Sequence, residues 1–257
     1  MCATMMPMKP TNKTSWGKEA TWYSEHLKDA DTYHAKVILP NVVRLVAPKK
    51  GQKVLEIGCG EGFFAEEIAK KGSVVTGCDI SPELIALAKK KGKASYLVTP
   101  AQDLSMFKDG SVDVVLAVLT LQNMERLDLV MKEVSRVLGK TGRFIFVLNH
   151  PVIRSPQTSS WDYDEKKKVQ YRRLDAYLSE RKVSIDMHPG SGKKSLTYSF
   201  QRSLQEYMKL LRGAGFSITR LEEWISHRKS TPGPRAKAED VARKEFPLFM
   251  MIEAQGH

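Results

Sequence analysis

Short apolar runs alternate with amphipathic stretches of helical period between residues 53 and 148, and few folds accommodate this pattern. The apolar runs predict strands at 53–57, 73–78, 94–98, 112–118 and 143–148. The stretches between them predict helices at 63–71, 82–91 and 127–138. Successive parallel strands need crossover connections, and helical crossovers cover the two faces of the sheet. The sequence therefore predicts an open, doubly wound, mainly parallel α/β domain.

The segments on either side of this alternation follow other patterns. Residues 22–46 carry a mostly helical rhythm interrupted at Pro40, which predicts one or two helices ahead of the sheet. After residue 148 the alternation stops, and a structureless loop over 149–200 would be unusual inside a compact domain. We therefore expect an insertion there with strands or helices of its own. The remaining pattern predicts a helix at 203–212, a basic connection at 226–245, and strands at 217–224 and 247–253.

Composition narrows the class of protein. The 257 residues include 41 Lys and Arg against 29 Asp and Glu, and the net charge of +12 suits nucleic acid, an anionic surface or an acidic substrate. The three cysteines are too few and too scattered for a disulfide framework, and no paired-cysteine motif indicates a metal. The sequence lacks an apolar run of about 18 residues and a signal-peptide pattern. We expect a soluble, cytoplasmic protein without a membrane segment.

A glycine-rich stretch, Val54-Leu55-Glu56-Ile57-Gly58-Cys59-Gly60-Glu61-Gly62, follows the first predicted strand. Glycines let the chain turn sharply at the carboxyl end of a strand, where doubly wound sheets bind their ligands. A dinucleotide fingerprint starting at Gly58 would need glycine at position 63, which is Phe63, and the Lys-Ser/Thr ending of a phosphate-binding loop is missing as well. The stretch predicts a nucleotide-like cofactor and argues against NAD and ATP.

Two acids follow the next predicted strands. Asp79 ends the second strand, 19 residues after Gly60, where a carboxylate can accept both hydrogens of a ribose diol. The alternative is a helix N-cap, a role that Ser81 before Pro82 already fills. Asp103 follows the third strand and is either a ligand contact or a plain loop acid.

The pattern E-x-G-x-G-x-G at 56–62 resembles motif I of the class I S-adenosylmethionine-dependent methyltransferases, and in particular their type 11 domains. Residues 53–148 are similar to this family in the order and spacing of their elements, and Gly213-Ala214-Gly215-Phe216 extends the similarity. The resemblance implies seven strands, the last antiparallel. It divides the chain into an N-terminal helical segment over the cofactor site (1–50), a methyltransferase core (51–148 and 201–257) and an inserted substrate lid (149–200).

The resemblance also implies the contacts of S-adenosylmethionine and of its product, S-adenosylhomocysteine. Glu56 would orient the loop and the ammonium group, Asp79 would hold the ribose, and Asp103 would accept the adenine amino hydrogen. The glycine backbone would pack against the methionyl part of the cofactor. The full set of expected cofactor contacts is Tyr23, Glu56, Gly58, Cys59, Gly60, Gly62, Asp79, Ile80, Gln102, Asp103, Leu104, Leu119 and Gln122.

Residues that act on the acceptor are harder to predict, because methyl transfer from a sulfonium is an in-line displacement that asks little covalent chemistry of the protein. His150 directly follows the fifth predicted strand, where a neutral imidazole can take a proton from a hydroxyl or amine nucleophile. A histidine hydrogen-bonded within a turn explains it equally well. His188 is a weaker second candidate. Aromatic residues of the insertion can pack as a small lid, cap an organic acceptor or stack on bases.

Three functions are compatible with these observations. The preferred one is a methyltransferase acting on an oxygen or nitrogen of a small molecule, as a monomer or homodimer. An RNA methyltransferase is favoured by the net charge of +12 and by basic residues in 226–245, and disfavoured by the absence of a recognisable RNA-binding module. The third is a non-catalytic protein that binds S-adenosylmethionine.

Overall fold

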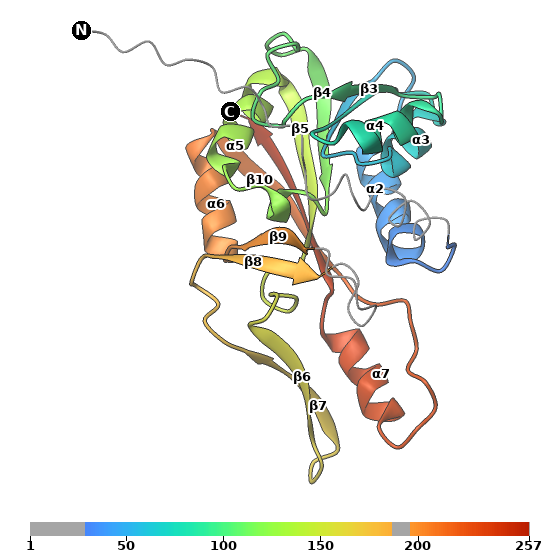
Figure 1. The fold of residues 1–257 in the computed structure, drawn as a ribbon, viewed down its shortest axis with the longest axis vertical. Helices are drawn as coiled ribbons and strands as arrows, with labels where there is room; N and C mark the ends of the chain where they lie inside the picture. Colours follow the sequence, from blue (N-terminus) through green and yellow to red (C-terminus); the bar gives the residue numbers. More distant parts are fainter. Residues whose placement is uncertain (1–28, 187–195, 257) are drawn as a thin grey trace, which may run out of the picture.

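The computed structural model describes residues 29–186 and 196–256, which form a seven-stranded sheet with two small hairpins beside it (Figure 1). The strand order is β10-β11-β5-β4-β1-β2-β3, and β11 runs antiparallel to both of its neighbours. This topology confirms the predicted doubly wound fold and its antiparallel last strand. The strands are β1 (Lys53–Ile57), β2 (Val74–Asp79), β3 (Ser95–Val98), β4 (Val112–Val118), β5 (Leu138–Asn149), β10 (Phe216–Trp224) and β11 (Phe249–Gly256).

Helices cover both faces of this sheet (Figure 1). On one side lie α2 (Leu39–Val46), α3 (Phe63–Ala69) and α4 (Pro82–Lys89), preceded by the π-helix η2 (His34–Ile38). On the other side lie α5 (Leu127–Val137) and α6 (Leu204–Gly213). None of the helices within the described ranges is long and apolar enough to cross a membrane.

The two hydrophobic cores explain why the strands read as continuous apolar runs. In β5, Phe144 and Phe146 pack in the core under α5 and α6, whereas Ile145 and Val147 pack in the core under α2, α3 and α4. Successive side chains of a strand point to opposite faces, so a strand covered on both faces needs apolar residues at every position. Because β1 pairs in parallel with β2 and β4, the carboxyl ends of these strands lie at one edge of the sheet.

Most elements differ from the sequence prediction by a few residues at their ends, and two differ more. β5 begins at Leu138, five residues before the predicted start, because Leu138 pairs with Val112 ahead of an irregularity that leads to the pair Arg143–Val114. The predicted connection over 226–245 contains a helix, α7 (Ala236–Glu245). Ala242 is the one buried residue of α7, so this helix lacks the apolar stripe that a sequence pattern needs.

The insertion predicted over 149–200 contains two antiparallel hairpins in its described part. One consists of β6 (Ser159–Asp164) and β7 (Val169–Leu174), and it extends away from the sheet towards α7 (Figure 1). The other consists of β8 (Arg181–Asp186) and β9 (Leu196–Gln201), and β9 contacts the short 3-10 helix η3 (Leu121–Asn123) that follows β4. The second hairpin therefore lies at the edge where the parallel strands end. Its role as a lid stays a prediction.

Candidate functional site

The loop between β1 and α3 makes a close turn that only glycine accommodates. Gly58, Gly60 and Gly62 have φ of 63°, 57° and 77°, a region that side chains disfavour. A Cβ on Gly58 would lie 2.0 Å from Thr120 Oγ1, and a Cβ on Gly62 would lie 2.2 Å from the Tyr96 hydroxyl. The loop is thus pressed against the residues that follow β4 on one side and against β3 on the other.

Glu56, one residue before the end of β1, is buried beneath this loop with 1% of its surface exposed. Burial raises the pKa of Glu56 to about 8; the nearby Asp79 adds to the rise, whereas the Ala65 N–H counteracts it. The Glu56 Oε2 atom has no hydrogen-bond partner among the described residues. A cation brought to this oxygen, such as an ammonium group, would supply the missing partner and favour the ionised carboxylate.

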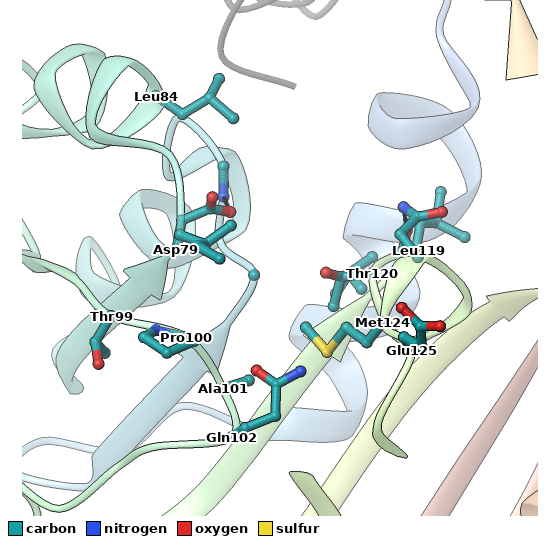
Figure 2. Close-up of a pocket in the computed structure, with 15 residues that line it drawn as sticks. Asp79, Leu84, Thr99, Pro100, Ala101, Gln102, Leu119, Thr120, Met124 and Glu125 are labelled. Atoms are coloured by element: carbon teal, nitrogen blue, oxygen red, sulfur yellow. Dashed lines mark hydrogen bonds between the residues drawn. The ribbon is translucent and has the colours of Figure 1, made fainter. Parts of the chain in front are cut away.

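Asp79 ends β2 with its carboxylate at the cavity wall (Figure 2). Its Oδ2 accepts the Gly60 N–H and its Oδ1 accepts the Ser81 N–H, both at 2.9 Å. Burial raises the pKa of Asp79, and these two backbone donors counteract the rise. Each carboxylate oxygen retains acceptor capacity, so a pair of hydroxyl groups can still bind there.

A first cavity of about 230 Å³ opens between the ends of β1, β2, β3 and β4. Figure 2 shows Asp79 and Leu84 on one side, Thr99 to Gln102 along the floor, and Leu119 to Glu125 opposite. The cavity combines two acidic residues, Asp79 and Glu125, with apolar side chains, which suits a ligand with hydroxyl groups and a flat apolar ring. Its lining residues are Gly58, Gly60, Asp79, Ile80, Leu84, Thr99, Pro100, Ala101, Gln102, Val118, Leu119, Thr120, Asn123, Met124 and Glu125.

A second cavity of about 350 Å³ adjoins the first, because Leu119 and Asn123 line both. Leu119 is held at φ 54°, unusual for a residue with a side chain, and such strain often marks functional sites. The second cavity is bounded by the turn after β5, the hairpin β8–β9 and the residues just beyond it. It is lined by His34, Leu119, Gln122, Asn123, Asn149, Pro151, Arg154, Ser155, Pro156, Ile185, Thr197, Ser199, Phe200, Gln201, Arg202 and Tyr207.

The residues predicted to contact a cofactor fall into three groups. Seven line one of the two cavities: Gly58, Gly60, Asp79, Ile80, Gln102, Leu119 and Gln122. Five lie beside the lining: Glu56 and Leu104 are buried, Cys59 and Gly62 belong to the glycine loop, and Asp103 is exposed with its Oδ1 accepting the Ser105 N–H at 3.1 Å. Tyr23 lies outside the described residues, as does His188. The binding roles of all these residues stay predictions.

Sequence reasoning missed several residues of the lining. Thr99 follows β3 directly and Glu125 follows η3 beyond β4, so the rule that ligands bind beyond the carboxyl ends of parallel strands was a usable signal for them. Arg154 and Arg202 of the second cavity carried no such signal. They are 48 positions apart in the sequence and meet only because the hairpin β8–β9 folds back over η3.

His150, the predicted general base, is buried in the turn after β5 and belongs to the lining of neither cavity. Its Nδ1 accepts the N–H groups of Val152 and Ile153 at 3.3 Å, and its Nε2 lies 2.8 Å from Glu223 Oε1. This pattern assigns the ring proton to Nε2. The next turn brings Arg154 to the second cavity, with the Arg154 N–H donating to the His150 carbonyl at 2.8 Å. A role in proton transfer stays a prediction.

Comparison with known proteins agrees with this geometry. A family model described as a methyltransferase domain matches residues 55–146. A demethylmenaquinone methyltransferase of Chlorobaculum parvum is 30% identical over 188 residues, which are 69% of this chain and 75% of that protein. A ubiquinone biosynthesis O-methyltransferase of Xanthomonas oryzae is 32% identical over 105 residues, 38% of this chain and only 44% of that protein. An S-adenosylmethionine-dependent methyltransferase structure from Mesorhizobium loti superposes with a TM-score of 0.66 at 23% identity, covering 84% of this chain and 96% of that one.

The matched residues 55–146 contain the glycine loop, Asp79 and the whole lining of the first cavity. The Chlorobaculum relative carries the similarity across most of both chains, and the Mesorhizobium structure shares the seven-stranded fold. The unpartnered Glu56 oxygen and the acceptor capacity of Asp79 fit a ligand with an ammonium group and a ribose. On these grounds the chain belongs to the class I S-adenosylmethionine-dependent methyltransferases, and it is an enzyme that takes S-adenosylmethionine as its cofactor.

Proposed function

We propose that this enzyme transfers the methyl group to an oxygen or nitrogen atom of a small molecule bound in the second cavity. The observation that carries this proposal is the wall formed by Leu119 and Asn123, which line both cavities. In-line displacement requires donor and acceptor to meet at short range with the reacting atoms aligned. Adjoining cavities with a common wall meet this requirement.

The cofactor site is assigned from the contacts of the first cavity. When bound, S-adenosylmethionine supplies a methyl group on a positively charged sulfur. Asp79 holds the ribose hydroxyls, and Glu56 accepts a hydrogen bond from the ammonium group at its free Oε2. Ile80 and Leu84 flank the adenine ring, and Gln102 offers it polar partners. Gly58 and Gly60 leave room for the methionyl part.

The acceptor site is assigned from the elements that enclose the second cavity. The turn at 151–156 and the hairpin β8–β9 cover this cavity, so a small acceptor there is screened from water, which would otherwise compete with it. Two relatives point the same way, since they are named for demethylmenaquinone and for ubiquinone biosynthesis, and quinones are small organic molecules.

Calorimetry and a transfer assay test the proposal. We expect S-adenosylmethionine and S-adenosylhomocysteine to bind and NAD not to bind. With isotopically labelled methyl donor, we expect label in small molecules of a cell extract and not in its RNA. Label in RNA would establish the alternative function, and cofactor binding without any transfer would indicate a non-catalytic protein. Tight NAD binding without adenosyl-ligand binding would overturn the cofactor site.

Asp113→Ala provides a matched control for Asp79→Ala in these experiments. The Asp113 carboxylate also accepts a backbone N–H, that of Lys53 at 2.7 Å, but from near the amino end of β4 and outside both cavities. Each substitution removes one acid and the backbone contacts of its carboxylate. Loss of cofactor binding in Asp79→Ala alone would separate the ligand contact from the general effect of removing a carboxylate.

A further inference from the structure

The second cavity has an unbalanced charge. Two arginines, Arg154 and Arg202, line it, and no Asp or Glu is present among the described residues of its lining. Most other arginines of the described chain are paired: Arg136 and Arg143, for example, form ion pairs with Glu133 and Glu253. The two cavity arginines form no ion pair within the described ranges. Their positive charges therefore stay unneutralised in a partly enclosed site.

Arg202 is 7% exposed and held in place by uncharged groups. Its Nη2 donates to the Glu125 carbonyl at 2.6 Å, and its guanidinium lies 5.3 Å from the centre of the Phe200 ring. Its Nη1 is buried and has no hydrogen-bond partner among the described residues. A buried donor of a charged group without a partner costs free energy, which a ligand acceptor would recover.

Arg154 lies in the turn after β5 and has no hydrogen bond from its guanidinium to any described residue. It lies 5.2 Å from the centre of the Phe249 ring. Burial lowers the pKa of Arg154; the nearby Tyr33 opposes this effect, and the like charge of Arg172 adds to it. Arg154 lines the second cavity and also a third cavity of about 300 Å³ whose lining includes Glu239, yet it forms no ion pair with a described residue. An anion bound in the second cavity would supply the counterion that Arg154 lacks.

An anion is the partner that both arginines lack. Guanidinium groups bind carboxylate and phosphate oxygens through paired hydrogen bonds, and these bonds are strongest where water is excluded. The rest of the lining suits an organic body, because Ile185 and Phe200 are apolar and Ser199 offers a hydroxyl group. We propose that the methyl acceptor is a small organic anion whose carboxylate or phosphate group is held by Arg154 and Arg202. This inference rests on the proposed function, because it assumes that the acceptor occupies the second cavity.

Binding of simple probes to the full chain tests the inference without turnover. Calorimetry with saturating S-adenosylhomocysteine would compare benzoate and phenyl phosphate, the anionic probes, with benzamide, their neutral counterpart. We expect the anions to bind and benzamide to bind at least tenfold more weakly. Arg154→Gln and Arg202→Gln should each weaken anion binding about tenfold or more, the effect of losing a hydrogen bond to a charged group. Preference for benzoate or for phenyl phosphate would identify the anionic group.

Arg173→Gln provides the matched control, since Arg173 lies in the same insertion, pairs with Asp175 and contacts neither cavity. It should leave anion binding unchanged. Arg154→Lys and Arg202→Lys keep the charge without the planar fork, and they should recover part of the anion affinity. Unchanged affinity for S-adenosylhomocysteine shows that each variant is folded with an intact cofactor site.

The outcomes separate this inference from the proposed function. If S-adenosylhomocysteine does not bind the wild-type enzyme, the cofactor assignment fails. If it binds while benzamide equals benzoate, or while neither anion binds, or while anion binding survives both Gln substitutions, the inference is overturned and the proposed function stands. A second test separates a cell extract by anion exchange and assays each fraction with labelled methyl donor. If only the fraction that does not bind the anion exchanger accepts label, the acceptor is not an anion and the inference is overturned.

Discussion

The buried carboxyl of Glu56 should make the cofactor-free enzyme lose stability as pH rises from 5 to 8, an effect that an exposed glutamate does not produce. Its pKa is raised from 4.5 to about 8 in the folded chain, chiefly by burial. Between these two values the folded state keeps the proton while the unfolded state has lost it. The folded state thus binds more protons at this group, so the contribution of Glu56 to stability is fully present below pH 4.5 and is lost as pH rises towards 8.

The size of the effect follows from the shift. Each pKa unit corresponds to 1.36 kcal/mol, so the rise from 4.5 to about 8 corresponds to at most about 5 kcal/mol of stability lost between those pH values. Glu56→Gln keeps the shape of the protonated carboxyl and removes its titration. We therefore expect Glu56→Gln to gain stability relative to wild type as pH rises from 5 to 8.

Denaturant unfolding of the cofactor-free enzyme at pH 5, 6, 7 and 8 measures this difference. Glu67→Gln serves as the matched control, because Glu67 is partly exposed on α3 and pairs with Lys70 at 2.6 Å. The difference between Glu67→Gln and wild type should vary little with pH over this range. A wild-type minus Glu56→Gln difference that stays constant from pH 5 to pH 8 would refute the reasoning.

The same carboxyl should report on the cofactor. If the ammonium group of S-adenosylhomocysteine binds at Glu56 Oε2, Glu56 ionises on binding and releases its proton between pH 5 and 8. Calorimetry in two buffers of different ionisation enthalpy counts the protons released. We expect net release in the wild type and much less in Glu56→Gln, and equal release in both would show that the ligand's ammonium group lies elsewhere.

Three further predictions concern the loop, the ribose contact and the turn after β5. Asp79→Ala should weaken S-adenosylhomocysteine binding by about 1.5–3 kcal/mol while the fold survives, and unchanged affinity by calorimetry would remove Asp79 from the site. Gly58→Ala should destabilise the protein much more than Gly51→Ala, because a Cβ at Gly58 would lie 2.0 Å from Thr120 Oγ1, whereas nothing lies within 4 Å of a Cβ at Gly51. Gly51 also has a positive φ, of 79°, so equal losses of unfolding free energy in the two variants would mean that backbone strain alone matters. His150→Ala should lower turnover by about 10²-fold or more with cofactor affinity near wild type. If turnover falls by the same factor at every pH, His150 only holds the turn. If the pH profile of turnover changes in His150→Ala but not in Glu223→Gln, which removes the carboxylate beside His150, proton transfer by His150 is supported.

The fold was predictable where burial is two-sided. β1 and β4 begin and end at the predicted residues, because most of their positions are apolar and buried; the charged residues are Lys53 and Glu56 in β1 and Asp113 in β4. The helix α7 was not predictable, since it buries only Ala242 and follows a segment rich in Pro and Gly. Its stability comes from contacts with β7, a strand more than 60 residues away, and a local pattern carries no trace of them.

One cavity of the site could be predicted from the sequence and the other could not. The first cavity is built from strand ends, and the rule for parallel sheets places Asp79 and Leu119 there from sequence alone. The second cavity depends on how an insertion folds back, so its arginines were visible only within a net charge of +12. That charge was compatible with RNA or with an acidic substrate, because a total does not say where the charges lie.

The location of the charges favours the small anion of our proposal over RNA. An RNA-binding surface draws on exposed cations that contact many phosphates, and its affinity falls steeply with salt. Arg126, Arg173 and Arg235 are exposed but form ion pairs with Asp128, Asp175 and Glu165, so acidic side chains already offset their charge. Arg154 and Arg202 line a partly enclosed cavity of about 350 Å³, a size that suits a small molecule. Acceptor binding should therefore depend on one anionic group and only weakly on ionic strength, because buried pairs are screened less than exposed ones. Acceptor binding measured at 50 and 500 mM salt checks this, and a steep loss of affinity would contradict binding to buried arginines.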